Sequence, residues 1–222
     1  MAAIYPICIK LDNLPCLVVG GGKVAERKVK ALLAAGGRVT VIGPDITPDL
    51  KNLALSDKLV HVARPYKKGD VDGFFLVISA TNDRQVNREI AAECHQRRIL
   101  LNTVDDPENC TFYVPATVRR GDLVIAVSTG GKSPLMARKI REELEHSYND
   151  AFGAYLDLLG EIRHNIIRNV RDTGKKEALL EELLSEAIWA ALKKGDYDKA
   201  KELVSRVYNG SGSESPDGSC SR

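Results

Sequence analysis

Short apolar runs and helix-forming stretches alternate along the first half of the chain. The apolar runs, which are typical of buried strands, lie at residues 16–19, 38–42, 59–63, 74–79 and 99–104. The stretches between them that favour helices lie at residues 23–35, 47–56 and 84–97. This alternation predicts an α/β fold with a parallel sheet, in which ligands bind at the carboxyl ends of the strands.

The pattern changes after residue 111. Residues 112–118 and 123–128 read as two strands joined by a tight turn, which predicts a β-hairpin, and a helix is expected at 135–145. Further helices are expected at residues 151–169, 175–193 and 198–208. Because a lone hairpin is marginally stable in water, it must dock on the preceding sheet or on the same element of a second chain. We therefore expect a homodimer that shares or exchanges this segment.

A glycine-rich turn separates the first predicted strand from the first predicted helix. Gly20, Gly22 and Ala25 form a G-x-G-x-x-A pattern, and Asp45 follows the second strand. Such glycines let the backbone approach a pyrophosphate, which the amino terminus of the helix attracts. A carboxylate at the position of Asp45 accepts hydrogen bonds from a ribose and favours NAD over NADP. The alternative is an ordinary crossover whose glycine-rich turn binds no ligand.

Polar residues also follow two later strands. Residues 80–82 directly follow the predicted strand at 74–79, and residues 102–105 lie at the carboxyl end of the next predicted strand. The nicotinamide of a bound dinucleotide should lie beside residues 102–105. Asp105 could exchange a proton there, or Asp105 and Asp106 could simply shape the turn before Pro107. The residues alone leave both readings open.

Composition narrows the class of protein. The 222 residues carry a net charge of +2, which gives no reason to expect a nucleic-acid partner. No apolar run approaches the roughly 20 residues of a membrane span, and no secretion signal is evident. We therefore expect a cytoplasmic protein that does not associate with a membrane. The five cysteines read as reduced thiols, and the four histidines show no ligand spacing, so no metal site is expected.

Three blocks of sequence carry a resemblance to a known family. These are LVVGGGKVAERKVKALLAAGGRVTV with ISATND, then LLNTVDDP, then FYVPATVRRGDLVIAVSTGGKSPLMARKIREELE. Together they resemble the precorrin-2 dehydrogenase family, the N-terminal region of siroheme synthase, some of whose members are also ferrochelatases. The resemblance implies an NAD-binding Rossmann domain at 1–113, a dimerisation segment at 114–147 and a C-terminal helical domain at 148–209. Residues 210–222 are expected to be a disordered tail.

The resemblance also implies an activity and its residues. The reaction is the NAD-dependent oxidation of precorrin-2 to sirohydrochlorin, with Asp105 as the catalytic residue. The residues expected to bind NAD are Gly20, Gly22, Lys23, Val24, Pro44, Asp45, Thr81 and Asn82. Asn102, Ser128 and Thr129 are expected to contact the substrate because they sit at strand ends; some family members carry serine in the loop where this chain has Thr129.

Three questions stay open in the sequence. Ferrous ion is a further substrate only if the chain is also a ferrochelatase, and the family includes members with and without that activity. The cations Arg119, Arg120, Lys132 and Arg138 could bind substrate carboxylates or simply be solvated. The alternative function is an NAD(H)-sensing regulatory module, in which no protonatable group is needed at residue 105.

Overall fold

A computed structural model describes residues 4–210 of the chain. The chain forms two compact units, the first ending at Val114 and the second beginning at Pro115. Each unit has its own hydrophobic core. The boundary predicted at residue 147, within the second unit, stays a prediction.

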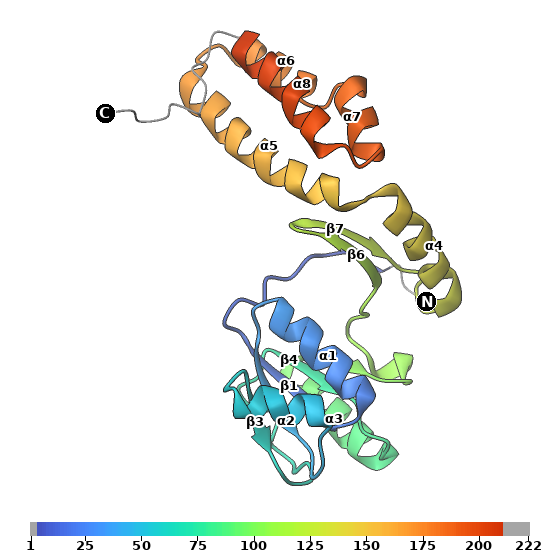
Figure 1. Cartoon of the computed structure of the whole chain (residues 1–222). Coiled ribbons are helices and arrows are strands. Elements are labelled where there is room, and N and C mark those ends of the chain that lie inside the picture. Colours follow the sequence, from blue (N-terminus) through green and yellow to red (C-terminus); the bar gives the residue numbers. More distant parts are fainter. Residues whose placement is uncertain (1–3, 211–222) are drawn as a thin grey trace. The chain divides into compact units, whose positions relative to one another are not determined.

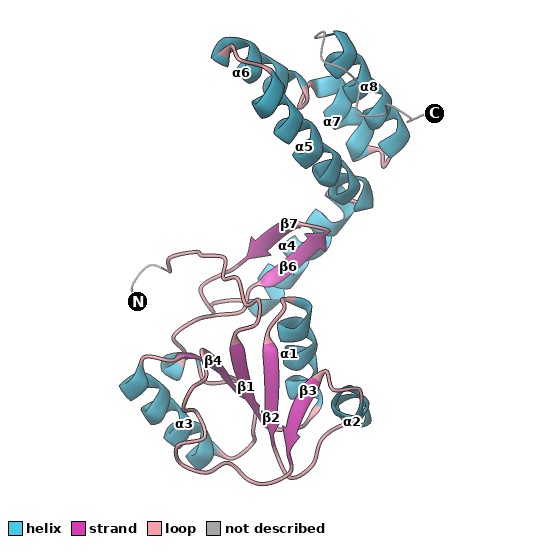
Figure 2. Ribbon diagram, turned by 90° about the vertical axis from the view of Figure 1, so that its left-hand side faces the viewer, coloured by secondary structure: helices cyan, strands magenta, loops and turns pink. Residues whose placement is uncertain are grey.

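The first unit is a five-stranded parallel sheet in the order β3-β2-β1-β4-β5. Its strands are β1 (Pro15–Val19), β2 (Arg38–Ile42), β3 (Leu59–Val62), β4 (Leu76–Ser79) and β5 (Leu100–Thr103). Its helices are α1 (Lys23–Ala34), α2 (Pro48–Leu55), α3 (Arg84–Arg97) and the short 3-10 helix η1 (Pro107–Asn109). Figure 2 shows α3 on one side of the sheet and α1 and α2 on the other. The predicted Rossmann-like α/β fold is therefore confirmed.

Strand β1 is central because both of its faces are apolar. Cys16 and Val18 contribute to the core beneath α1 and α2, whereas Leu17 and Val19 contribute to the core beneath α3. All four side chains are buried, as expected for a parallel strand covered on both faces. This packing brings the ends of β1, β2 and β4 side by side at one edge of the sheet.

The second unit combines a hairpin with helices (Figure 1). Strands β6 (Ala116–Arg120) and β7 (Leu123–Val127) pair antiparallel, and the turn between them contains Gly121 at φ +55°. The helices are α4 (Pro134–Ser147), α5 (Asp150–Asn169), α6 (Thr173–Glu182), α7 (Glu186–Lys193) and α8 (Tyr197–Gly210). Helix α4 packs on the hairpin, and α5 to α8 enclose a core that includes Phe152, Leu183 and Leu192.

Most boundaries differ from the prediction by one or two residues, and two differences have a clear structural reason. The single helix expected at 175–193 is broken, because α6 ends at Glu182 and α7 starts at Glu186. Leu183 is fully buried at the break, and its carbonyl accepts a hydrogen bond from the Tyr155 hydroxyl, which satisfies a group released by the end of the helix. The first hairpin strand begins at Ala116 rather than at 112, because the Phe112 amide bonds to the Leu101 carbonyl of the first unit.

The tail predicted to be disordered begins at Gly210, which is the last residue of α8. Its remaining residues, 211–222, lie outside the described part of the chain.

Candidate functional site

A cavity of about 580 Å³ lies at the carboxyl ends of β1, β4 and β5, within the first unit. Its walls come from the first turn of α1, the β4–α3 connection, the start of α3 and the loop from β5 to η1. The lining residues are Val24, Ala80, Thr81, Asn82, Arg84, Asn87, Arg88, Val104, Asp105, Asp106, Glu108 and Asn109. Parallel α/β sheets bind their ligands at this edge, so the cavity is the candidate site.

The glycine-rich turn forms the entrance to α1, and two of its glycines have different surroundings. Gly20 has φ +111°, and a Cβ there would lie 2.3 Å from the Ala80 carbonyl oxygen, so packing alone requires glycine. Gly22 has φ −81°, which any residue adopts, and no heavy atom lies within 4 Å of its Cβ position. The fold therefore does not explain Gly22. An open backbone that a bound pyrophosphate can approach does explain it.

The amino terminus of α1 offers donors to such a pyrophosphate. Gly22 is its N-cap and provides no side-chain hydrogen bond, so the first amides of the helix depend on solvent or a ligand. Val24 lines the cavity, whereas the exposed Lys23 side chain pairs with Glu26 at 3.1 Å.

Pro44 and Asp45 follow β2, next to the glycine turn. Both are exposed and lie outside the cavity lining. His61 on β3 donates from Nε2 to the Gly43 carbonyl at 2.9 Å, and the Thr47 amide donates to the Gly21 carbonyl at 3.0 Å. The first bond ties the β2–α2 connection to β3, and the second ties it to the glycine turn. The glycine turn and the uncapped start of α1 therefore fit the pyrophosphate of a dinucleotide. The contact of Pro44 and Asp45 with a dinucleotide stays a prediction.

Asp105 occupies an unusual backbone position on the cavity wall. Its φ is +59°, in the left-handed region that aspartate tolerates better than most residues. Its side chain is exposed, and it has no hydrogen bond or ion pair with any residue in 4–210. Asp106 differs, because its Oδ2 accepts a bond of 2.7 Å from Asn109 Nδ2 and so shapes η1. The carboxylate of Asp105 is thus available to a ligand.

The loop that carries Asp105 is tied back to β5. The Cys110 thiol accepts from the Thr103 amide at 3.2 Å and lies 3.3 Å from the Asp106 carbonyl, to which it can donate. Burial raises the pKa of Cys110, which keeps the thiol protonated. Thr111 Oγ1 accepts from the Leu101 amide at 2.7 Å. These bonds hold the ends of the loop and leave Asp105 at its apex.

The three predicted substrate residues have other partners within their own units. Asn102 is buried, donates to the Phe112 carbonyl at 3.1 Å and accepts from Lys28 Nζ at 3.4 Å, and burial lowers the pKa of Lys28. In the second unit, Ser128 Oγ accepts from the Gly130 amide, and Thr129 Oγ1 bonds to the amide and carbonyl of Ser133. Their contact with substrate stays a prediction.

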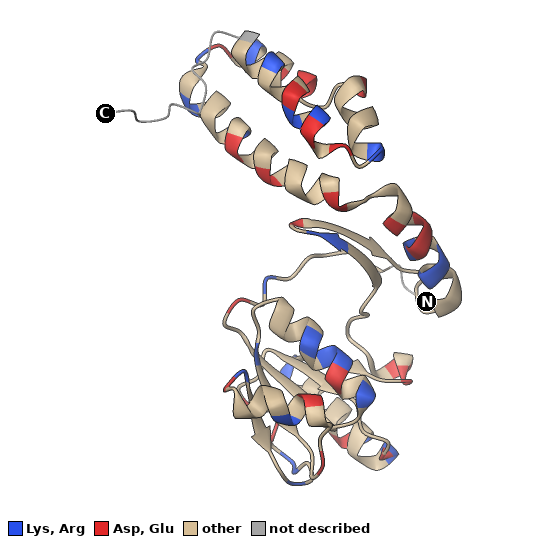
Figure 3. Ribbon diagram, viewed as in Figure 1, with Lys and Arg blue, Asp and Glu red and all other residues tan. Residues whose placement is uncertain are grey.

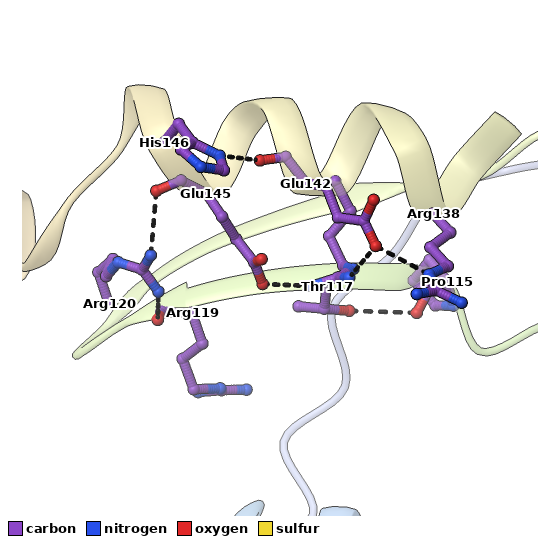
Figure 4. A network of polar contacts seen from close by, with 9 residues as sticks. Pro115, Thr117, Arg119, Arg120, Arg138, Glu142, Glu145 and His146 are labelled. Atoms are coloured by element: carbon purple, nitrogen blue, oxygen red, sulfur yellow. Dashed lines mark hydrogen bonds and ion pairs between the residues drawn. The ribbon is translucent and has the colours of Figure 1, made fainter. Parts of the chain in front are cut away.

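Two of the four cations left open in the sequence have partners on α4 (Figure 4). Arg120 Nη2 donates to the Glu145 carbonyl at 3.2 Å, and Arg138 pairs with Glu142 at 2.8 Å.

Arg84, Asn87 and Arg88, which line the cavity, were missed by sequence reasoning. All three belong to α3, and only Asn87 is buried, where it accepts a bond of 2.6 Å from Ser79 Oγ. The available signal was the helix that follows the end of β4, whose first turns must face the same sheet edge as the glycine turn.

The described residues contain no group of three or more histidine, cysteine or acidic side chains that could hold a metal ion. None of their helices is both long and apolar enough to cross a bilayer.

Comparisons with known proteins agree with this geometry. Residues 7–116 match a family model described as NAD(P)-binding, and residues 120–147 match one described as sirohaem biosynthesis protein central. The chain is 36% identical over 204 residues to siroheme synthase 3 of Aeromonas hydrophila subsp. hydrophila, covering 91% of this chain and 44% of that protein. It is 37% identical over 203 residues to siroheme synthase of Thioalkalivibrio sulfidiphilus, covering 91% and 42%.

The chain thus spans less than half the length of these curated relatives. A solved structure, the precorrin-2 dehydrogenase SirC, matches with a TM-score of 0.77 and 27% identity, covering 93% of this chain and all of that one. An NAD(P)-binding domain followed by a sirohaem central segment is common to these matches. The chain belongs to the family that comprises the N-terminal region of siroheme synthase and SirC.

Proposed function

We propose that this chain is an NAD-dependent precorrin-2 dehydrogenase, which oxidises precorrin-2 to sirohydrochlorin in siroheme biosynthesis. The observation that carries the proposal is the match to SirC over the whole length of that chain, together with a cavity at the dinucleotide-binding edge. The open position at Gly22 leaves room for the dinucleotide, and the free carboxylate of Asp105 can receive the proton that the reaction releases.

The oxidation removes two hydrogens from the macrocycle, one as a hydride and one as a proton. NAD, when bound, supplies the hydride acceptor. The chain itself must orient the dinucleotide and receive the proton. Gly22 and the first turn of α1 hold the phosphates, and Asp45 accepts hydrogen bonds from the adenosine ribose.

Asp105 is the residue that we assign to the proton. Its carboxylate lines the cavity at the end of β5 and has no partner within residues 4–210. A carboxylate that no protein donor engages is free to accept a proton from a substrate carbon or nitrogen beside it. The left-handed backbone at this residue, held by the loop bonds of Cys110 and Thr111, keeps the side chain at the loop apex.

We also propose a homodimer joined through the hairpin and α4. The two-stranded sheet β6–β7 leaves an outer edge on each strand, and α4 exposes Leu135, Met136 and Ile140. Ferrous ion enters the proposal only as a second substrate, because a chelatase need not hold its metal permanently; Asp105 would then also accept protons released from the ring.

Replacing Asp105 by Asn tests the enzyme against the NAD(H)-sensing alternative. Asparagine tolerates the same positive φ, so the loop should keep its shape. We expect kcat for precorrin-2 to fall by about 100-fold or more, with the dissociation constant for NAD unchanged. The measurement is an anaerobic assay with enzymatically generated precorrin-2 and NAD, followed by NADH and tetrapyrrole absorbance, first without metal and then with ferrous ion.

Asp57→Asn is the matched control, because Asp57 also has a positive φ, of +55°, and lies outside the cavity. It should retain wild-type turnover. A wild-type protein that binds NAD and never oxidises precorrin-2 would contradict the proposed function and favour the sensor. A metal-dependent spectral change beyond the rate without protein would add ferrochelatase activity.

A further inference from the structure

Two arginines on α3 line the cavity and have no partner among the described residues. Arg84 is the first residue of the helix and Arg88 lies one turn later, so both project from the same helical face. Both side chains are exposed, and neither forms an ion pair or hydrogen bond with any residue in 4–210. Some other helical arginines pair with an acid on their own helix, as Arg138 does with Glu142 and Arg206 with Glu202.

Helix stability does not account for Arg84. A positive charge in the first turn opposes the helix dipole, which favours acidic residues there. The amides of this turn are already capped by Asp83, whose Oδ1 accepts from Gln85 at 2.8 Å and from Val86 at 3.2 Å. Arg84 adds nothing to that cap. Its position on the cavity wall points to an anionic ligand instead.

The charges of the cavity are unevenly distributed. Arg84 and Arg88 stand on α3, whereas Asp105, Asp106 and Glu108 belong to the loop from β5 to η1. Figure 3 marks both kinds of charge on the ribbon. A ligand with acidic groups on its periphery would place them against α3 and away from the loop acids.

We infer that Arg84 and Arg88 bind the side-chain carboxylates of the tetrapyrrole substrate, an inference that rests on the proposed function. The macrocycle carries several carboxylates around its edge, and each guanidinium can bind one through two parallel hydrogen bonds. Two guanidiniums spaced one helical turn apart engage two acidic groups of the same ring. Held in this way by α3, the ring meets Asp105 on the other wall.

The pyrophosphate of NAD is the other anion that must bind near this cavity, and the geometry places it at the glycine turn rather than at the two arginines. Gly22 and the uncapped start of α1 form its cradle, and neither Arg84 nor Arg88 belongs to that turn. The two assignments predict different kinetic effects. Loss of a substrate contact raises KM for the tetrapyrrole, whereas loss of a phosphate contact weakens NAD binding.

The experiment compares Arg84→Gln, Arg88→Gln and the double variant with wild type in the same anaerobic assay. Each single variant should raise KM for precorrin-2 about tenfold or more, because a charged hydrogen bond is lost. The double variant should raise it further, while the dissociation constant for NAD, measured by titration without substrate, stays within about twofold. Arg84→Lys and Arg88→Lys keep the charge without the paired donors and should have intermediate KM values.

Arg27→Gln is the matched control, because Arg27 is an exposed arginine of α1 outside the cavity. Raising the salt concentration should increase KM for wild type more than for the double variant, which a merely structural role would not produce. Circular dichroism and thermal unfolding of each variant exclude a folding defect, and exposed helix positions tolerate glutamine.

Unchanged KM in the double variant would overturn the inference, while wild-type turnover would still support the proposed function. A weaker NAD affinity with unchanged KM for precorrin-2 would also overturn it and assign the arginines to the cofactor. No turnover by wild type would remove the proposed function and the inference with it.

Discussion

Gly20 and Gly22 are two residues apart in one turn, but glycine is needed for different reasons. At Gly20 the backbone has φ +111°, and the Ala80 carbonyl would lie 2.3 Å from a Cβ. At Gly22 the backbone is ordinary and the space beyond it is open. Packing therefore requires glycine at position 20, whereas at position 22 only the proposed dinucleotide would require it.

The same substitution should therefore affect mainly NAD binding at position 22 and mainly stability at position 20. Gly22→Ala should cost at most about 1 kcal/mol of stability, as expected for alanine at an N-cap, while weakening NAD binding by about tenfold or more because the methyl group occupies the phosphate cradle. Gly20→Ala should destabilise the protein by about 2 kcal/mol or more through strain and overlap. Urea unfolding measures the stabilities, and fluorescence titration measures NAD affinity. Unaltered NAD affinity in Gly22→Ala would contradict the role assigned to that residue.

Some residues of the candidate site could be predicted from the sequence, and others could not. Gly22, Thr81, Asn82 and Asp105 follow apolar runs directly, so the ends of the predicted strands locate them. The place of Arg88 on the cavity wall was not predictable in this way. An arginine on a helix is usually solvated, and which elements lie beside it depends on the tertiary fold. Asn102 is also at a strand end, but the pleat turns its side chain toward Lys28, on the α1 side of the sheet.

At the scale of elements, a chain of ion pairs that includes Glu26 and Lys30 joins α1 to α2. The Glu26 carboxylate pairs with Lys23 at 3.1 Å and Lys30 at 2.9 Å, and Lys30 in turn pairs with Asp49 of α2 at 2.6 Å. Hydrogen bonds from Lys30, Thr47 and Lys23 lower the pKa of Glu26 from 4.5 to about 2. The ionised carboxylate is therefore favoured by the folded state.

This linkage predicts a specific acid sensitivity. A carboxyl group whose pKa is lowered by folding stabilises the protein above its unfolded pKa of 4.5, and that contribution disappears as the pH falls toward about 2. Wild type should thus be more stable than Glu26→Gln at about pH 6, and the difference should shrink steadily below about pH 4.5. Urea midpoints at a series of pH values measure it. Glu89→Gln, an exposed acid on α3, is the control and should show less pH dependence. A constant difference between wild type and Glu26→Gln at every pH would refute the linkage.

Which elements form was largely predictable, and where they end was less so. Apolar runs such as residues 16–19 and 74–79 indicate buried strands because a parallel sheet is covered on both faces. The break between α6 and α7 was missed, since Leu183 and its neighbours continue a helical pattern. Only the packed core shows that the Tyr155 hydroxyl donates a hydrogen bond to the Leu183 carbonyl at this break.

At the scale of the whole molecule, the two units have separate cores and carry different parts of the proposal. The first holds the cavity, the glycine turn and Asp105. The second holds the hairpin and α4, whose outward side chains give it an apolar surface. Leu135 is 76% exposed and Met136 58%, which is unusual for large apolar residues unless a partner covers them.

The homodimer predicts that this surface is buried in solution. Wild type should sediment at twice the chain mass of 24.3 kDa. The double variant Leu135→Glu with Ile140→Glu should shift it to the monomer, because glutamates would be buried against apolar groups of the partner. Sedimentation velocity at micromolar concentration measures the masses, and circular dichroism should show that helix content is retained.

Leu55→Glu is the control, since Leu55 is 84% exposed on α2 of the other unit. This substitution should leave the mass unchanged. A monomeric wild type, or a double variant that stays dimeric, would exclude this face as the interface. If the double variant stays dimeric, the two chains must instead meet through the outer edges of β6 and β7, which the two glutamates leave intact.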